Sequence, residues 1–467
     1  MAKSLTVGKP TALIVGFTVP LLVGNLFQQL YSFTDAVVVG RVLGISALAA
    51  VGAAAALMSL LMGFAWGMST GLAIPVARAF GAGDSRATRR AVAAGIIVAA
   101  VVTVVVTVVG VVFARAALVA LGTPASLLPE ATIFLQVIFA GAAVTMAYNF
   151  RGSTIRGLGD SRTPLAILVT SCVLNIGLVV AFVVILDLGV AGAALATVVA
   201  QFISVVLCLV IIRLRIPELR LRRADWRVSR SEVVEQTKLG LSVGAQGTVV
   251  SLGALLVQYA VNGLGPAAVA AFTAASRVEN VALAPLGSFG ATMVTYVAQN
   301  HGARRWRRIR SGVRSTAVLA SALAVVLGAV NIVFGVTLVR LFVDDGQREV
   351  ITMAHEYLIV SGVSYVLLAL LFVYRNALQG LGLSLVSTVA VFMQLALRAV
   401  AALVLVGQLG FWGITLASPL AWLAALVPVA CWWIVERRRL IDHEHRDRDE
   451  PDRTQVQVRD PTSKGTI

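Results

Sequence analysis

The sequence predicts an all-α polytopic membrane protein, in which twelve transmembrane helices form two six-helix lobes. Composition is the first observation behind this fold class, because the 467 residues are 58% hydrophobic and only 13% charged. A mean hydropathy of +0.90 lies outside the range of soluble globular proteins. The second observation is the length of the apolar runs, which reach the roughly 20 residues needed to cross about 30 Å of hydrocarbon. These runs are continuously apolar, whereas the strands of a membrane barrel alternate.

An internal duplication is the third observation. Residues 41–54 and 262–275 carry the same pattern of glycine, alanine and aliphatic residues, 221 positions apart. The same offset relates two further pairs of segments, 80–83 with 301–304 and 189–201 with 410–422. Repeats of apolar helices are typical of secondary transporters. An even number of spans in each copy predicts lobes related by a pseudo-twofold axis along the membrane normal.

The apolar runs predict the individual helices. In the first copy they lie near residues 12–37, 46–74, 90–113, 130–150, 164–186 and 190–212. In the second copy they lie near residues 239–261, 267–297, 313–340, 352–374, 384–406 and 411–435. Glycines close several of these runs at matching places in the two copies, where they end helices and permit tight turns.

The polar segments between and after the runs divide the chain. We assign residues 1–212 to the first lobe and residues 239–436 to the second. Residues 213–238 alternate arginine with apolar side chains, which suits a basic cytoplasmic linker lying along lipid headgroups. Residues 437–467 are charged and lack an apolar period, so we expect a disordered cytoplasmic tail.

The distribution of Lys and Arg predicts the orientation. Placing the N-terminus in the cytoplasm puts every arginine-rich loop on the inside and leaves four arginines outside: Arg41, Arg115, Arg340 and Arg348. Positively charged loops favour the cytoplasmic side, so both termini should be cytoplasmic. The net charge of +16 is therefore explained by topology and anionic headgroups, and we expect no nucleic-acid partner.

A polar stripe marks the first span. Asn25, Gln28, Ser32 and Asp35 recur at spacings of three and four, with Tyr31 at the edge, so they share one helical face. Polar groups are costly in hydrocarbon, so this face should line a wet cavity. We assign Asn25, Gln28, Tyr31 and Ser32 to a substrate cavity.

Asp35 is the candidate coupling group. It is the only carboxylate of the first span and falls in its outer half. A carboxyl group removed from water holds its proton more tightly, so it can take up a proton outside and release it when its surroundings change. The alternative is a carboxylate that caps the helix end beside Arg41.

The second copy has its own intramembrane charges. Arg277 and Glu279 lie two residues apart in the eighth span, so they point to nearly opposite faces and cannot pair. Arg398, in the eleventh span, is the predicted partner of Glu279, and Asn280 adds a polar group. Our hypothesis is that the Glu279–Arg398 ion pair is structural or a gate rather than part of the substrate site.

The sequence lacks the motifs that would indicate ATP binding or metal-dependent catalysis. The sequence has no glycine-rich phosphate loop ending in Gly-Lys-Ser or Gly-Lys-Thr, so ATP should not drive this chain. It has no His-Glu-x-x-His motif, and its three cysteines lack metal-binding spacing. We expect no enzyme activity, no cofactor and no metal, which leaves transport driven by an ion gradient.

Three segments together resemble the multidrug and toxic compound extrusion (MATE) family of bacterial antiporters: residues 24–44, 274–303 and 156–164. The resemblance extends from about residue 10 to residue 439. It implies two six-helix lobes around a central cavity, in a monomer of the bacterial inner membrane. Such proteins export organic cations and drugs in exchange for protons or sodium ions.

The resemblance also assigns residues. In family members with a first-lobe cation site, the carboxylate matches Asp35, and the accompanying Asn and Thr match Asn175 and Thr197. The sequence departs from this pattern at Val179 and Gln394, where members carry further acids. A sodium cage needs several hard oxygen ligands, so the departure favours protons as the coupling ion.

Two other functions remain open at this point. One is a flippase for lipid-linked saccharides, from the same superfamily. Such flippases usually have extra spans and a more cationic cavity than this chain provides. The other is a membrane receptor or scaffold without transport, against which the duplicated lobes argue.

Overall fold

The computed structural model describes residues 4–449, except for the side chains at 30–37, 39, 448 and 449. Every regular element in this part of the chain is helical. The first lobe contains α1 (Pro10–Val42), α2 (Gly44–Gly81), α3 (Ser85–Ala120), α4 (Leu128–Ala140), α5 (Ala142–Gly157), α6 (Arg162–Val180), the π-helical turn η1 (Ala181–Ile185) and α7 (Gly189–Arg215). Two 3₁₀ turns follow, η2 (Pro217–Leu219) and η3 (Arg223–Trp226). The second lobe contains α8 (Arg230–Asn262), α9 (Pro266–Gly302), α10 (Trp306–Val339), α11 (Arg348–Gly380), α12 (Ser384–Val400), the π-helical turn η4 (Ala401–Leu405), α13 (Val406–Leu409) and α14 (Phe411–Asp449).

The all-α prediction with twelve spans is confirmed. Among the described residues, 11 helices are long and apolar enough to cross a membrane, and the bent pair α4–α5 brings the number to 12. The bend of 48° falls at Gly141, between the two helices. A Cβ at this position would lie 2.4 Å from Cγ2 of Val198, so a side chain would not fit between α5 and α7.

The duplication is visible in the backbone. The π-helical turns η1 and η4 occupy corresponding places, because each lies at the end of the fifth predicted span of its copy. Both turns lie at the same depth of the repeat although their sequences differ. The copies diverge in the fourth span, which is broken between α4 and α5 in the first lobe and continuous as α11 in the second.

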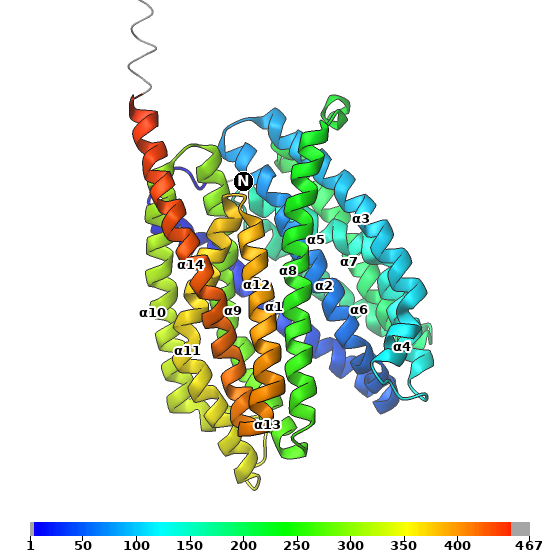
Figure 1. The fold of residues 1–467 in the computed structure, drawn as a ribbon. Helices are drawn as coiled ribbons and strands as arrows, with labels where there is room; N and C mark the ends of the chain where they lie inside the picture. The colour runs from blue at the N-terminus through cyan, green and yellow to red at the C-terminus, as the bar shows by residue number, and fades with distance from the viewer. Residues whose placement is uncertain (1–3, 450–467) are drawn as a thin grey trace, which may run out of the picture.

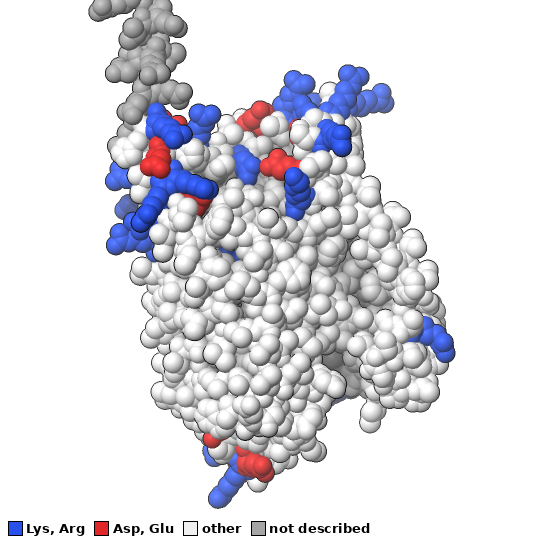
Figure 2. All heavy atoms as spheres, in the orientation of Figure 1, with Lys and Arg blue, Asp and Glu red and all other residues white. Residues whose placement is uncertain are grey.

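The basic residues gather at one end of the molecule, which we call the basic end. It carries the N-terminus, the α2–α3 turn and the connection from α7 to α8 (Figure 1). Figure 2 shows most of the Lys and Arg side chains on this end and a wide belt of uncharged atoms below it. This belt is the surface that faces hydrocarbon. The opposite end carries a small group of acidic and basic side chains.

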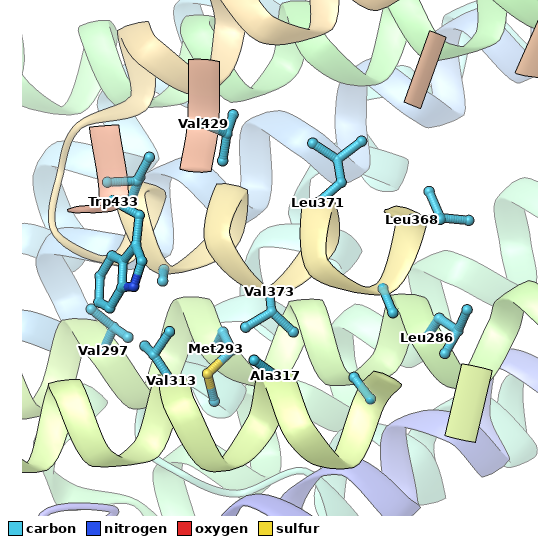
Figure 3. Close-up of a cluster of buried hydrophobic side chains, with 14 of the residues drawn as sticks. Leu286, Met293, Val297, Val313, Ala317, Leu368, Leu371, Val373, Val429 and Trp433 are labelled. Atoms are coloured by element: carbon cyan, nitrogen blue, oxygen red, sulfur yellow. The ribbon is translucent and has the colours of Figure 1, made fainter. Parts of the chain in front are cut away.

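Apolar packing inside each lobe positions the helices. The largest buried cluster belongs to the second lobe and joins α9, α10, α11 and α14, with Met293, Val313, Val373 and Trp433 among its members (Figure 3). Ile14 of α1 belongs to the same cluster. The first half of α1 therefore packs into the second lobe, and α1 also packs against α6 of the first lobe.

The tail differs from its prediction. Residues 437–449 continue α14 instead of being disordered, and residues 450–467 lie outside the described part. Trp306 donates a hydrogen bond from Nε1 to Oδ2 of Asp447 at 2.7 Å, and Arg310 pairs with Glu444. Polar contacts to α10 therefore hold this helix, which an argument from apolar periodicity could not reveal.

The connection between the lobes is shorter than the predicted linker, because α7 ends at Arg215 and α8 begins at Arg230. Ile216 and Leu219 are buried in an apolar cluster of the first lobe. Ser229 caps α8, and the side chain of Glu232 accepts a hydrogen bond from the Ser229 amide at 2.6 Å. The segment thus folds onto the first lobe and delivers α8 to the boundary between the lobes.

Candidate functional site

The two lobes meet along a row of glycines, which we call the glycine seam. It consists of Gly63, Gly67 and Gly71 of α2 with Gly240, Gly244 and Gly247 of α8. A Cβ on Gly67 would lie 2.4 Å from the carbonyl oxygen of Val243, and one on Gly247 would lie 2.0 Å from that of Gly63. The two helix backbones are therefore in direct contact. Small residues at spacings of four permit such an approach between membrane helices.

Close backbone contact continues to the basic end. A Cβ on Gly81 would lie 2.0 Å from the carbonyl oxygen of Gln299, and a Cβ on Gly302 would lie 1.8 Å from that of Arg78. Gln299 also donates from Nε2 to the carbonyl oxygen of Gly157 at 2.7 Å. Since Gln299 and Gly302 end α9 while the other three belong to the first lobe, these contacts close the basic end between the lobes.

Ion pairs add to this closure. Arg78 pairs with Glu235 at 3.0 Å, and Arg90 pairs with Glu232 at 2.7 Å. Both pairs join the first lobe to the start of α8. Each pair is partly exposed to solvent, so it contributes less than the backbone contact and weakens as salt rises. Such contacts can break and re-form at low cost.

The lobes separate toward the opposite end. Among the described residues, the hydrogen bond between α2 and α8 that lies farthest from the basic end runs from Ser251 Oγ to the Ser59 carbonyl oxygen, at 3.3 Å. Beyond it, Ile45 at the start of α2 and Tyr259 near the end of α8 are 86% and 74% exposed. Figure 1 shows α2 and α8 diverging there, and Figure 2 shows a notch between the lobes. The molecule is therefore closed at the basic end and open at the other.

A small polar cavity lies inside the first lobe. It measures about 100 Å³ and is enclosed by α1, α2, α5, α6 and α7. Asn25 and Gln28 of the predicted stripe line it, together with Tyr148, Asn149 and Arg156 of α5. Asn25 also donates from Nδ2 to Ser288 Oγ of α9 at 3.0 Å. Asn25 and Gln28 thus face a cavity, and Asn25 reaches across to the second lobe; their role in substrate binding stays a prediction.

The rest of the stripe lies outside the described side chains. This applies to Tyr31, Ser32 and Asp35, of which only the helical backbone is described. Their roles in substrate binding and cation coupling stay predictions.

Asn175 and Thr197 are brought together. Asn175 donates from Nδ2 to Thr197 Oγ1 at 3.3 Å, between α6 and α7. Both side chains are buried, and Asn175 Oδ1 has no hydrogen-bond partner among the described residues. A buried amide oxygen without a donor is costly, so a proton donor or a cation suits this position.

The predicted direct ion pair of the second lobe is not formed. Glu279 is buried and accepts a hydrogen bond from the Tyr357 hydroxyl at 2.8 Å, while Arg398 contacts Ser418 Oγ at 3.4 Å. In the described part of the chain, no nitrogen–oxygen contact within 4.0 Å joins Glu279 to Arg398. Arg398 instead lies against Gly253, where its Nη1 would be 3.2 Å from a Cβ.

Arg277 and Asn280 lie on the other face of α9. Both are exposed, and the guanidinium of Arg277 lies 5.9 Å from the ring centre of Phe342. Two of the four residues grouped in the second lobe therefore face away from the buried polar site, in agreement with the opposite faces predicted for Arg277 and Glu279.

The sequence alone did not predict two features of this region. The glycine seam has a readable signal, because Gly63, Gly67 and Gly71 follow a spacing of four inside one span. Tyr357 has no such signal. Its hydroxyl becomes a partner of Glu279 only through the packing of α11 against α9.

Two duplicated six-helix lobes, in contact at one end and separated at the other, form an architecture typical of membrane transporters. The MatE family model matches residues 20–183 and 245–404, one match in each lobe, and the chain belongs to this family.

"Probable multidrug resistance protein YpnP" of Bacillus subtilis is 27% identical over 394 residues, covering 83% of this chain and 87% of the relative. "Probable multidrug resistance protein YoeA" of the same organism is 27% identical over 358 residues, covering 75% and 77%. A solved structure described as the outward-facing conformation of a multidrug resistance MATE family transporter of the MOP superfamily superposes with a TM-score of 0.84 at 21% identity, covering 94% of this chain and 99% of that one. The chain is therefore a multi-pass membrane protein of the multidrug efflux class.

Proposed function

We propose that this protein exports organic cations from a bacterial cell in exchange for protons, by alternating access of the cavity between its lobes. The observation that carries the proposal is the asymmetric contact between the lobes. Glycine backbones and breakable ion pairs close the basic end, whereas the opposite end is separated. If one lobe rocked against the other, the basic end would open and the opposite end would close.

The distribution of arginines supports the orientation. If the basic end is cytoplasmic, as positively charged loops favour, both termini lie inside. The structure is then the state open to the outside. In that state a substrate is released and a proton can reach the first lobe.

The first lobe contains the groups that suit coupling. Asp35 is the carboxylate proposed to carry the proton, and the buried Asn175–Thr197 pair offers a polar environment on two neighbouring helices. Asn25 and Gln28 line a cavity of the same lobe, and we propose that they contact the substrate there. We propose a monomer, because each lobe provides its own apolar core.

The test uses inverted membrane vesicles and a fluorescent aromatic cation. We expect an interior-acid pH gradient to drive uptake by the wild type, and the Asp35→Asn variant to fall to the background of empty vesicles. The conservative change removes the titrating group and preserves size. Glu349→Ala, an exposed carboxylate in the first turn of α11, is the matched control and should transport normally.

Three outcomes would contradict the proposal. Normal uptake by Asp35→Asn would exclude this carboxylate as the coupling group. Uptake driven by a sodium gradient at fixed pH would replace the proton with sodium. Translocation of a lipid-linked saccharide without transport of any cation would favour the flippase.

A further inference from the structure

The outer surface of the first lobe has a groove that the transport cycle does not use. It lies between α3 and the bent pair α4–α5, and its volume is about 450 Å³. Ala99, Thr103, Met146 and Phe150 are buried and form its floor. The groove shares no residue with the polar cavity of the first lobe. Arg151 is the one charged residue in its lining.

The groove opens toward the membrane. Val104 and Val108, on its α3 side, are 63% and 56% exposed, and α3 has the highest hydropathy of the candidate spans. Small side chains hollow the surface, and the bend at Gly141 separates α4 from α5 along its other wall. From Ile96 to Val108 the α3 wall is about 18 Å long at 1.5 Å per residue, similar to the roughly 15 Å of one leaflet's hydrocarbon.

Arg151 stands at the end of the groove nearer to the basic end. It lies on α5, two turns before that helix ends at Gly157, a depth from which an arginine reaches the headgroups. No carboxylate pairs with Arg151 among the described residues, and none lines the groove. An unpaired guanidinium beside hydrocarbon attracts an anion, preferably a phosphate, and would repel an organic cation.

Thr103 provides a second, independent observation. It is 5% exposed, lines the groove, and its Oγ1 has no hydrogen-bond partner. Many helical hydroxyls of this chain bond the carbonyl four residues earlier, as Thr18 and Thr170 do at 2.8 and 3.0 Å, whereas Thr103 does not. Thr103 lies on the hydrocarbon side of Arg151, where its hydroxyl would donate a hydrogen bond to the ester carbonyl of a bound phospholipid.

We propose that this groove binds one anionic phospholipid, with its phosphate on Arg151 and an acyl chain along α3. The occupant follows from the combination of an apolar wall of one-leaflet length, a lone cation at headgroup depth and a buried hydroxyl without an acceptor. A transported cation would be repelled by Arg151 and would offer no acceptor to the Thr103 hydroxyl. The lipid fills the space between α3 and α5 and so supports the first lobe.

The test is native mass spectrometry of the purified full-length protein in mild detergent. Phosphatidylglycerol or phosphatidylcholine of matched chains is added, and bound lipid is counted as collision energy rises. We expect one phosphatidylglycerol to survive energies that remove all phosphatidylcholine. Arg151→Gln removes the charge and Ala143→Trp fills the groove, so each should abolish this retention.

Matched controls separate the groove from the general surface. Arg115→Gln removes an exposed arginine at the far end of α3, and Val101→Trp adds the same bulk to α3 at a 63% exposed position outside the groove. Both should retain the lipid as the wild type does. Equal retention of the two lipids, or unchanged retention in a monodisperse Ala143→Trp protein, would overturn the proposal whether or not Arg151→Gln folds.

Discussion

Replacing Gly81 with valine is expected to abolish transport while both lobes stay folded. The added side chain would meet the carbonyl oxygen of Gln299, since even a Cβ would lie 2.0 Å away. Backbone atoms cannot move aside as a flexible side chain can, so the basic end could not close. The protein would be held in states in which that end is open. Uptake of the fluorescent cation should fall to the vesicle background.

A labelling experiment distinguishes a blocked closure from misfolding. Ala298 lies in a buried apolar cluster that contains side chains from both lobes. A cysteine placed there should react slowly with a polar thiol reagent in the otherwise native protein and quickly in the Gly81→Val background. Gly52→Val, on the same helix with no atom within 4 Å of its added Cβ, is the control and should transport normally. Wild-type transport by Gly81→Val would show that these contacts are not part of the cycle.

Removing the Glu279 side chain is expected to destabilise the second lobe. Glu279→Ala leaves the Tyr357 hydroxyl without an acceptor at a position that is 2% exposed. An unsatisfied buried polar group costs about 1–3 kcal/mol. We expect a lower apparent Tm, measured by thermal unfolding in detergent.

The conservative variant Glu279→Gln tests whether the lost hydrogen bond to Tyr357 causes the drop in Tm. Glu279→Gln keeps an oxygen that can accept from Tyr357, so its apparent Tm should lie between those of the wild type and Glu279→Ala. Exposed Glu349→Ala should leave the Tm unchanged. If Glu279→Ala unfolds at the wild-type temperature, the carboxylate has no structural role, and a gating or coupling role would have to explain its burial.

Local sequence patterns were sufficient to predict the helices. Apolar runs determine which segments cross the membrane, so twelve spans and two copies could be read directly. The break between α4 and α5 could not, because the close approach of Gly141 to Val198 depends on how another helix packs. The helical tail was missed for a related reason, since its partners Trp306 and Arg310 lie on α10.

Residues that share one helix could be grouped on one face from the sequence alone. Asn25 and Gln28 line a common cavity because their spacing places them on one face. The prediction that Arg398 pairs directly with Glu279 was wrong. Pairing between helices depends on the rotation of each helix about its axis and on its depth in the membrane. Those quantities follow from packing across the lobe, and they put Tyr357 nearer than Arg398.

The most direct test of alternating access is a distance measurement across the open end. Spin labels at Ile45→Cys on α2 and Tyr259→Cys on α8, in a protein whose three native cysteines are replaced by alanine, report the separation of the lobes. By pulsed electron spin resonance we predict two distances, whose populations shift when pH or a transported cation is changed. A single distance that stays the same under every condition would contradict the account.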